Sequence, residues 1–321
     1  MTSALDYLNA RNAEHRTVIA SHSGSFHADD LFGVAVLRLL SPSSLVIRTR
    51  DLHELAAADF RVDVGGQWDP ATGDFDHHQK GFSGARPDGT GYASAGLVWA
   101  AYGQAYVKLL HPELDDDIAQ AVADRIDQEL MIFIDRVDTG ADSVAPGLFG
   151  ISAMLAQFVP SGRETKGMGA DQRDDVYDEK FLLACDLVGQ MLRNAVRGAV
   201  EKALSAQYVR ESDRLMDGRV LLLAESGLMW EDTVCAEMPE VLFVVYPNSD
   251  ERAYHVHVVP KEPQSFKARK DLPEAWAGLR DKALAEASGV PDAYFCHTGR
   301  FICGCLSKDG ALKLATLATV A

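Results

Sequence analysis

The sequence contains no apolar run that approaches the ~20 residues of a membrane-spanning helix, so no contact with a membrane is expected. Its first 16 residues mix acidic and basic side chains and lack the apolar core of a secretory signal. Cysteine is scarce as well. The five cysteines are odd in number and lack the spacing of a disulfide framework, which argues against a secreted scaffold. These absences predict a cytoplasmic protein.

The chain is also short of positive charge, with 31 Lys and Arg against 47 Asp and Glu and a net charge of −16. The imbalance is concentrated in residues 1–190, which hold 15 basic and 29 acidic residues. A protein that grips long nucleic acid usually has a basic surface, and this part of the chain does not predict one. Bound divalent cations would neutralise some of the acidity. The one basic cluster in the sequence is formed by Arg252, Lys261, Lys267, Arg269 and Lys270.

Short apolar runs and amphipathic stretches alternate through the first half of the chain. This alternation predicts an α/β fold with a mainly parallel sheet flanked by helices. Two further helices are expected at 147–159 and 171–207, with a flexible linker between them. The predicted strands are 17–20, 45–50 and 61–64, and the predicted helices are 31–40, 95–110 and 115–134.

From residue 219 onward the pattern changes to three expected strands followed by two expected helices, which is typical of a smaller α+β domain. A length of 321 residues suffices for two ordinary domains. We therefore predict a catalytic, metal-binding domain over 1–205 and a substrate-binding α+β domain over 206–321. The later strands are expected at 220–224, 241–246 and 253–259, and the helices at 274–287 and 311–320.

Two histidine–aspartate motifs in the first domain carry the chemistry. Each lies at the end of a predicted strand, and in open α/β sheets sites collect at the carboxyl ends of strands. Carboxylate and neutral imidazole together suit Zn²⁺, Mn²⁺ or Fe²⁺. The motifs offer more ligands than one metal ion needs. Enzymes that hydrolyse phosphoesters often use two metal ions that lie roughly 3.5–4 Å apart. The first motif contains His22, His27, Asp29 and Asp30, and the second contains Asp63, Asp76, His77 and His78.

A single aspartate in such a sequence is usually a helix cap, a turn former or a solvated surface group. We interpret four aspartates of this region in that way, namely Asp30, Asp59, Asp69 and Asp74. Cys303 and Cys305, which are separated by one glycine, are interpreted as small residues of a tight strand or turn, because no second pair of sulfurs lies nearby in the sequence.

Together with segments farther along the chain, these motifs resemble the Myg family, a branch of the DHH-type phosphoesterases that is also described as metal-dependent protein hydrolases. The resemblance extends from about residue 17 to residue 317. It implies a DHH phosphoesterase-like fold and 3′-to-5′ exoribonuclease activity. The matching segments are 22–30, 63–70, 76–79, 94–97, 135–140, 259–266, 272–281 and 295–302.

The resemblance implies two metal positions that share Asp63 as a bridging ligand. Asp135 is an alternative to Asp138, and the sequence does not rank the two. A histidine stands at position 27, where the wider superfamily commonly has an aspartate, and an added imidazole moves the preference away from Mg²⁺. We expect Mn²⁺, with Zn²⁺, Fe²⁺ or Mg²⁺ as alternatives. The implied ligands are His22, His27 and Asp63 for one ion, and Asp29, Asp63, His77 and Asp138 for the other.

The catalytic residues implied are Asp63, Asp76 and His78. Asp76 would orient a histidine through its ring N–H, and His78 would contact the phosphate or support a ligand. A hydroxide activated by the two ions would attack phosphorus in line. The residues expected to bind substrate are Ser94 and Gly96 in the first domain and Arg252, Arg269 and His297 in the second.

Three functions remain open from the sequence. The first is an exoribonuclease or oligoribonuclease acting on RNA or short oligonucleotides. The second is a small-molecule phosphoesterase of the pyrophosphatase or nucleotide bisphosphate phosphatase type. The third is a metal-stabilised scaffold without activity, against which the complete set of candidate ligands argues. The basic cluster of the second domain favours the first function. The sequence leaves a homo-oligomer open.

Overall fold

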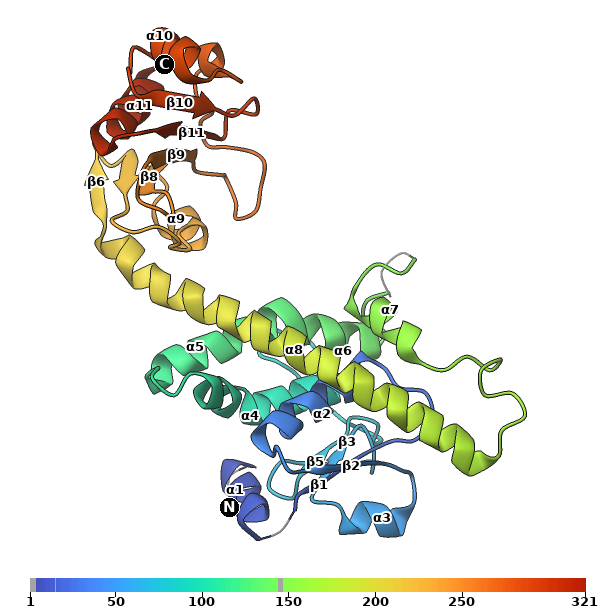
Figure 1. The fold of residues 1–321 in the computed structure, drawn as a ribbon. Coiled ribbons are helices and arrows are strands. Elements are labelled where there is room, and N and C mark those ends of the chain that lie inside the picture. Colours follow the sequence, from blue (N-terminus) through green and yellow to red (C-terminus); the bar gives the residue numbers. More distant parts are fainter. Residues whose placement is uncertain (1–3, 15, 144–146) are drawn as a thin grey trace. The chain divides into compact units, whose positions relative to one another are not determined.

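A computed structural model describes residues 4–14, 16–143 and 147–321. The chain forms two compact units, residues 1–199 and residues 200–321 (Figure 1). Helix α8 (Ala170–Glu211) begins in the first unit and ends in the second, so the boundary predicted after residue 205 also falls within this helix. Among the described residues, no helix is both long and apolar enough to cross a membrane.

The first unit is built on a five-stranded sheet with the order β2-β1-β3-β5-β4. Neighbouring strands are parallel except at one edge, where β4 pairs antiparallel with β5. This agrees with the predicted mixed α/β fold and its mainly parallel sheet. The strands are β1 (Val18–Ser21), β2 (Leu45–Arg48), β3 (Phe60–Val62), β4 (Trp68–Asp69) and β5 (Asp74–Phe75).

The register of the parallel strands aligns their carboxyl ends. Ser21 of β1 lies beside Arg48 of β2 and Val62 of β3, and Val62 lies beside Phe75 of β5. The residues that follow these strands therefore leave the sheet at one edge, where an open parallel sheet builds its site. Among them are His22, Asp63 and Asp76.

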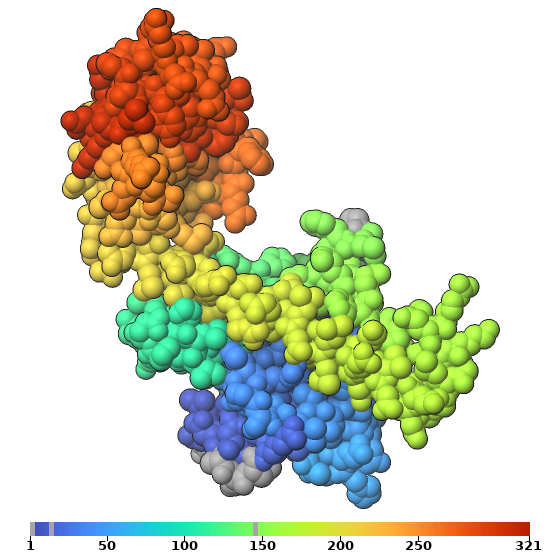
Figure 2. Space-filling model, in the orientation of Figure 1, coloured from blue at the N-terminus to red at the C-terminus, as the bar shows by residue number. Residues whose placement is uncertain are grey.

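Helix α2 (Ala28–Leu40) is the central helix of the first unit. Ten consecutive residues, 28–37, are buried, because α2 packs between the sheet, α4 (Ser94–Leu110) and α8. Gly33 allows the close approach, since a Cβ there would lie 2.7 Å from Cγ1 of Val62. In Figure 2 the yellow-green atoms of α8 lie on the blue atoms of α2, and Phe26, just before α2, contacts Phe181 of α8 edge-on.

The other helices of the first unit are short. The helix predicted over 115–134 is interrupted by a π-helical turn, and the one predicted over 147–159 is confined to 151–158. The elements are α1 (Ala4–Glu14), α3 (Leu52–Ala57), α5 (Asp116–Ile126), the π-turn η1 (Asp127–Met131), α6 (Ile132–Asp138), α7 (Ile151–Leu155) and the 3₁₀ turn η2 (Ala156–Phe158).

The second unit contains a six-stranded sheet with the order β10-β11-β9-β8-β7-β6, in which only β7 and β8 are parallel. Its elements are β6 (Asp213–Leu215), β7 (Val220–Leu222), α9 (Glu231–Glu237), β8 (Phe243–Pro247), β9 (Tyr254–Val258), the 3₁₀ turn η3 (Glu274–Trp276), α10 (Asp281–Ser288), β10 (Ala293–Cys296), β11 (Ile302–Cys305) and α11 (Lys308–Val320).

The two faces of this sheet have different partners. Val256, Cys303 and Cys305 belong to a core shared with α10 and α11, so both cysteines are apolar packing residues of a strand, as interpreted from the sequence. Val244 belongs to a second core with residues of α9. The helix predicted over 274–287 was wrong in its first half, because Gly278 adopts a φ of 72° and α10 begins only at Asp281.

Candidate metal centre

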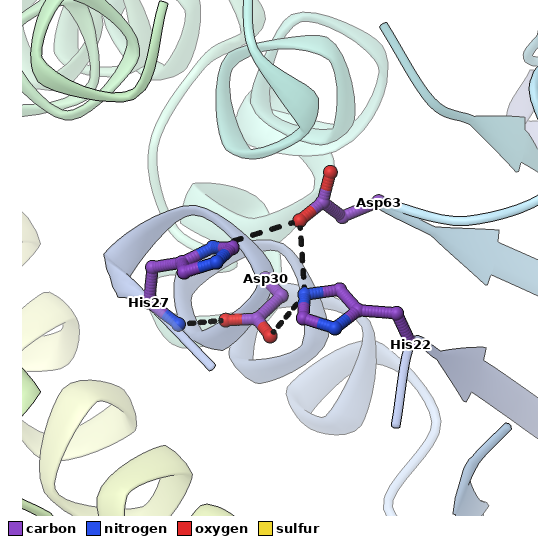
Figure 3. A group of neighbouring side chains, drawn as sticks. All are labelled: His22, His27, Asp30 and Asp63. Atoms are coloured by element: carbon purple, nitrogen blue, oxygen red, sulfur yellow. Dashed lines mark hydrogen bonds and ion pairs between the residues drawn. The ribbon is translucent and has the colours of Figure 1, made fainter. Parts of the chain in front are cut away.

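Asp63 lies at the centre of the site, and its two carboxylate oxygens face different histidines. Oδ2 lies 3.3 Å from Nε2 of His22 and 3.8 Å from Nδ1 of His27 (Figure 3). Oδ1 lies 3.6 Å from Nε2 of His77 and 3.3 Å from Nδ1 of His78. This divided arrangement is the one that a carboxylate bridging two ions requires.

The backbone at Asp63 is strained. Its φ of 59° lies in the left-handed region, which residues other than glycine rarely occupy. Gly65 and Gly66 follow with φ of 102° and 69°, so the chain turns sharply at the end of β3. The N–H of Gly66 donates to Oδ2 of Asp76 at 2.6 Å, which fixes the turn to the strand beside it. Strain of this kind is typical of functional sites.

The first group of candidate ligands consists of His22, His27, Asp30 and Asp63 (Figure 3). Asp30 was interpreted from the sequence as a cap or surface group, and only the cap is correct. Its Oδ1 accepts the N–H of His27 at 3.0 Å at the start of α2. Its other oxygen lies 3.1 Å from Nε2 of His22, and the residue is fully buried. Asp30 is therefore part of the site that sequence reasoning missed.

In the neutral form that a metal ligand requires, the His22 ring presents a lone pair to this group. Its Nδ1 lies 3.2 Å from the carbonyl oxygen of Ser23, which can only accept, so Nδ1 carries the hydrogen of the neutral ring. Nε2 is then directed at two carboxylates. Within the described residues, Nε2 of His22 and Oδ2 of Asp30 and Asp63 are buried without a hydrogen bond. Buried polar atoms need a partner, and a divalent cation fits all three.

The second group of candidate ligands consists of Asp29, His77 and Asp138. Nε2 of His77 lies 3.1 Å from Oδ2 of Asp138 and 3.9 Å from Oδ2 of Asp29. It too is buried without a hydrogen bond to the described residues. Asp29 accepts the N–H of Ser94 at 3.0 Å and that of Ala95 at 2.6 Å. The first turn of α4 thus holds this carboxylate in place.

Ser94 and Gly96 do not have surfaces that a substrate could reach. Ser94 is fully buried, and its hydroxyl lies 3.4 Å from Oδ1 of Asp63. Gly96 is also buried, and a Cβ there would lie 1.9 Å from Oδ2 of Asp135. The space beside Gly96 is therefore occupied by a carboxylate of the protein. This geometry speaks against both residues as substrate contacts.

Asp135 belongs to a separate ion-pair network behind the site. Its Oδ2 lies 2.7 Å from Nη2 of Arg86, and its Oδ1 accepts the N–H of Gly96 at 3.1 Å. Arg86 also donates two hydrogen bonds to Asp127, at 2.7 and 2.6 Å. Of the two aspartates between which the sequence did not decide, Asp138 faces His77 and Asp135 faces Arg86.

The electrostatics of the site favour a cation. Burial alone would lower the pKa of His22 and His77, but neighbouring carboxylates outweigh it and raise both to about 10. Burial, Asp63 and Asp138 raise the pKa of Asp29 well above its ordinary value. Burial opposes ionisation of Asp63, yet His22 and His77 hold the pKa of this carboxyl below its ordinary value. Excess carboxylate here attracts positive charge.

Asp76 and His78 form a hydrogen-bonded pair at the edge of the site. Oδ1 of Asp76 lies 2.8 Å from Nδ1 of His78 and accepts its backbone N–H at 3.0 Å. The His78 side chain is 62% exposed, so it can meet a ligand. Both residues line a cleft of about 620 Å³ together with His22 and Asp63.

Arg50 also lines this cleft and was missed by sequence reasoning. It is exposed, and it follows β2 at the edge where the site lies. Its position at the carboxyl end of the strand predicted over 45–50 was the available signal. A guanidinium at the mouth of an acidic cleft is suited to bind a phosphate by two hydrogen bonds.

The three substrate residues predicted in the second unit have different environments. The guanidinium of Arg269 donates to four backbone carbonyls, including those of Val234 and Cys235 in α9. This use of its donors as a helix cap speaks against Arg269 as the phosphate clamp. Arg252 is exposed, with Asp250 at 4.0 Å. His297 is exposed and accepts the N–H of Gly299 at 2.9 Å.

The other aspartates set aside in the sequence lie outside the site. Asp59 is buried, however, and accepts the N–H of Val18 at 2.8 Å, so its interpretation as a solvated group was wrong. Asp74 is buried as the ion-pair partner of Arg61. Asp69 is exposed and accepts the N–H of Ala71 in a turn, as expected.

A mainly parallel α/β unit with histidine and aspartate ligands at its strand ends defines a protein of the metal-binding class. Comparison with known proteins gives the family. The MYG1_exonuc model, described as an uncharacterised protein family (UPF0160), matches residues 18–319. The chain therefore belongs to the MYG1 exonuclease family.

Several relatives match along most of their length. The MYG1 exonuclease of Mus musculus is 33% identical over 323 residues, covering 92% of this chain and 83% of the relative. The MYG1 exonuclease of Homo sapiens is 32% identical, with coverages of 92% and 84%. The MYG1 protein YER156C of Saccharomyces cerevisiae is 31% identical, and the match covers 95% of this chain and 96% of the relative.

Proposed function

We propose that this protein is a metal-dependent exoribonuclease or oligoribonuclease that works from the 3′ end of its substrate. Family membership and the names of the mammalian relatives support a nuclease. The observation that carries the metal-dependent mechanism is the position of Asp63, whose two oxygens face separate histidine groups. Orphaned nitrogen atoms on His22 and His77 support the same conclusion.

In this proposal, His22, His27, Asp30 and Asp63 hold one ion, and Asp29, Asp63, His77 and Asp138 hold the other. Bound divalent ions supply Lewis acidity and a nucleophilic hydroxide at neutral pH. Mn²⁺ suits this mixture of imidazole and carboxylate better than Mg²⁺ does. The DHH-like architecture implied by the sequence remains part of the proposal.

The chain's own residues would bind and orient the phosphate. Arg50 supplies a positive charge in the cleft, and His78, held by Asp76, supplies an exposed ring nitrogen. Arg252 and His297 remain candidates for contacts with more distant parts of the strand, since both side chains are exposed. Because the first unit is strongly acidic, affinity for a polyanion depends on these few groups and on bound cations.

A panel of substrates tests the proposal most simply. Protein supplied with Mn²⁺ is given 5′-labelled RNA, the same sequence as DNA, a dinucleotide and pyrophosphate. We expect stepwise shortening of the labelled RNA from its 3′ end and no hydrolysis after chelation. Hydrolysis of pyrophosphate alone would replace this proposal with a small-molecule phosphoesterase. Arg50→Ala should slow RNA hydrolysis at subsaturating substrate, whereas Arg16→Ala, which removes an exposed cation elsewhere in this unit, should not.

A further inference from the structure

The second unit contains a pocket of about 440 Å³ that the proposed function does not use. It is formed by the end of α8, the segment between β7 and α9, and strands β8 and β9. Three aromatic side chains line it, namely Trp230, Tyr246 and His257. We propose that this pocket binds one unpaired base of the nucleic-acid strand; this proposal rests on the nuclease function.

The aromatic lining favours a flat ring. The ring of His257 lies 5.4 Å from that of Trp230 at an interplanar angle of 73°. Tyr246 lies on the neighbouring strand and contacts His255 edge-on at 5.6 Å. Aromatic surfaces that accept bases by stacking are the usual means by which proteins bind single strands without reading their sequence. The volume is in the range of small-molecule sites.

His257 offers a hydrogen bond that no described residue satisfies. Its Nδ1 is buried and has no partner within the described part of the chain. Burial and the neighbouring His255 lower the pKa of His257 to about 4, so the ring is neutral at physiological pH. A neutral imidazole nitrogen can pair with the donor or acceptor groups on the edge of a base.

The charges around the pocket exclude a phosphate as its occupant. Glu225 and Glu231 lie in its wall, and the one cation among the described residues that line it, Lys202, is 3.1 Å from Asp232. An anion would meet repulsion from these carboxylates. A base carries no charge, and its amino groups can donate to carboxylates. The lining therefore selects the base rather than the backbone of the strand.

The sheet beside the pocket offers a second stacking surface. Strand register places Tyr246, His255, Gly304 and Phe295 in one row across four strands. A Cβ at Gly304 would lie 2.5 Å from the rings of Phe295 and Tyr294, so glycine lets these rings lie over the strand. Neighbouring bases of the bound nucleic-acid strand can therefore stack on this row of rings.

The test measures binding apart from cleavage. Full-length protein carrying Asp63→Ala, which should not cleave, is titrated into labelled eight-residue RNA and into versions with one abasic residue at each position. We expect one abasic position to weaken binding about tenfold, in the range of one stacked base. Tyr246→Leu should weaken binding of intact RNA by the same factor and make that position insensitive to base removal.

Controls separate a lost ring from a damaged fold. Tyr246→Phe keeps the ring and should bind as the parent does, whereas Tyr208→Leu removes a tyrosine that is 58% exposed on α8 outside the pocket and should have no effect. The base site would be overturned if the Tyr246→Leu protein bound intact RNA as tightly as its parent does. It would also be overturned if the loss of affinity from Tyr246→Leu and the loss from removing the base were additive. If the wild type does not cleave RNA but its binding still depends on the base, only the proposed nuclease function would be overturned.

Discussion

At the scale of the residue, Asp63 combines three properties that seldom occur together. It is buried, it has a left-handed backbone, and its carboxylate is shared between two histidine groups. An aspartate can adopt this backbone at a cost of about 1–3 kcal/mol. The fold holds it there because the glycines that follow and the carboxylate of Asp76 fix the turn.

Asp63→Asn should therefore lower the turnover of RNA by at least about a thousandfold, because each ion supplies several kcal/mol of transition-state stabilisation. The measurement is hydrolysis of labelled RNA with saturating Mn²⁺. The matched control is Asp69→Asn, which removes an exposed carboxylate from the same unit and should leave turnover unchanged. Near-normal turnover by Asp63→Asn would contradict the shared role of this carboxylate.

Binding of metal should depend on pH with a definite sign. In the metal-free protein the pKa of His22 and of His77 is raised to about 10, so both rings carry protons near neutrality and must lose them to become ligands. Affinity for Mn²⁺ should increase as the pH rises from about 6 toward 10. Calorimetry in buffers with different ionisation enthalpies would measure the protons released.

His22→Gln should release fewer protons than the wild type on binding Mn²⁺, since one protonated ring is gone. Binding that is independent of pH across this range, with no proton release, would show that these histidines are not ligands.

Single residues also mark the limit of prediction from sequence. Asp29 and Asp30 are adjacent at the start of α2, and only one was expected at the metal. A carboxylate three residues into a helix is correctly read as a cap, but its second oxygen was free to face His22. Arg269 was assigned to substrate because it belongs to the basic cluster and a guanidinium can bind a phosphate by two hydrogen bonds, but backbone carbonyls of α9 accept its donors. Contacts of this kind depend on tertiary structure.

At the scale of the element, the site is built where three parallel strands end together. The positions of β1 and β3 were predictable from their apolar runs, and the rule that sites lie at carboxyl ends then located the motifs. The register that aligns Ser21, Val62 and Phe75 was not predictable, because short strands fix their register through packing. Strands β10 and β11 and helix α9 were also missed.

Helix α4 positions the site through its first turn. Ser94 and Ala95 donate to Asp29, and Gly96 leaves room for Asp135. Gly96→Ala should displace Asp135 from Arg86 and disturb Asp29, because the new methyl group would lie 1.9 Å from a buried carboxylate oxygen. We expect the free energy of unfolding to fall by about 1–3 kcal/mol, as for overpacking, together with weaker Mn²⁺ binding.

The control for this substitution is Gly198→Ala in α8. In the described part of the chain, no atom outside the helix's own local backbone lies within 4 Å of the added Cβ at that position, so alanine should stabilise the helix by up to about 1 kcal/mol. Urea unfolding of both variants distinguishes the two cases. A Gly96→Ala protein as stable as Gly198→Ala would mean that the fit between α4 and Asp135 is unimportant.

At the scale of the whole molecule, the structure contains two units, and the sequence changes from alternating strands and helices to three expected strands followed by two expected helices. The boundary predicted after residue 205 and that of the structure, after residue 199, both fall within α8, which continues across them without a break in composition. The acidity of residues 1–190 also has a structural reason in part. Several carboxylates are buried together at the strand ends. Burying this negative charge is unfavourable unless cations bind there.

The most direct test of the account is anomalous scattering at the manganese edge from crystals grown with Mn²⁺. We predict two peaks per chain, roughly 3.5–4 Å apart, one beside each carboxylate oxygen of Asp63. The first should lie among His22, His27 and Asp30, and the second among Asp29, His77 and Asp138. Absence of manganese from this cluster at saturating Mn²⁺, or a single ion that does not contact Asp63, would contradict the proposed centre.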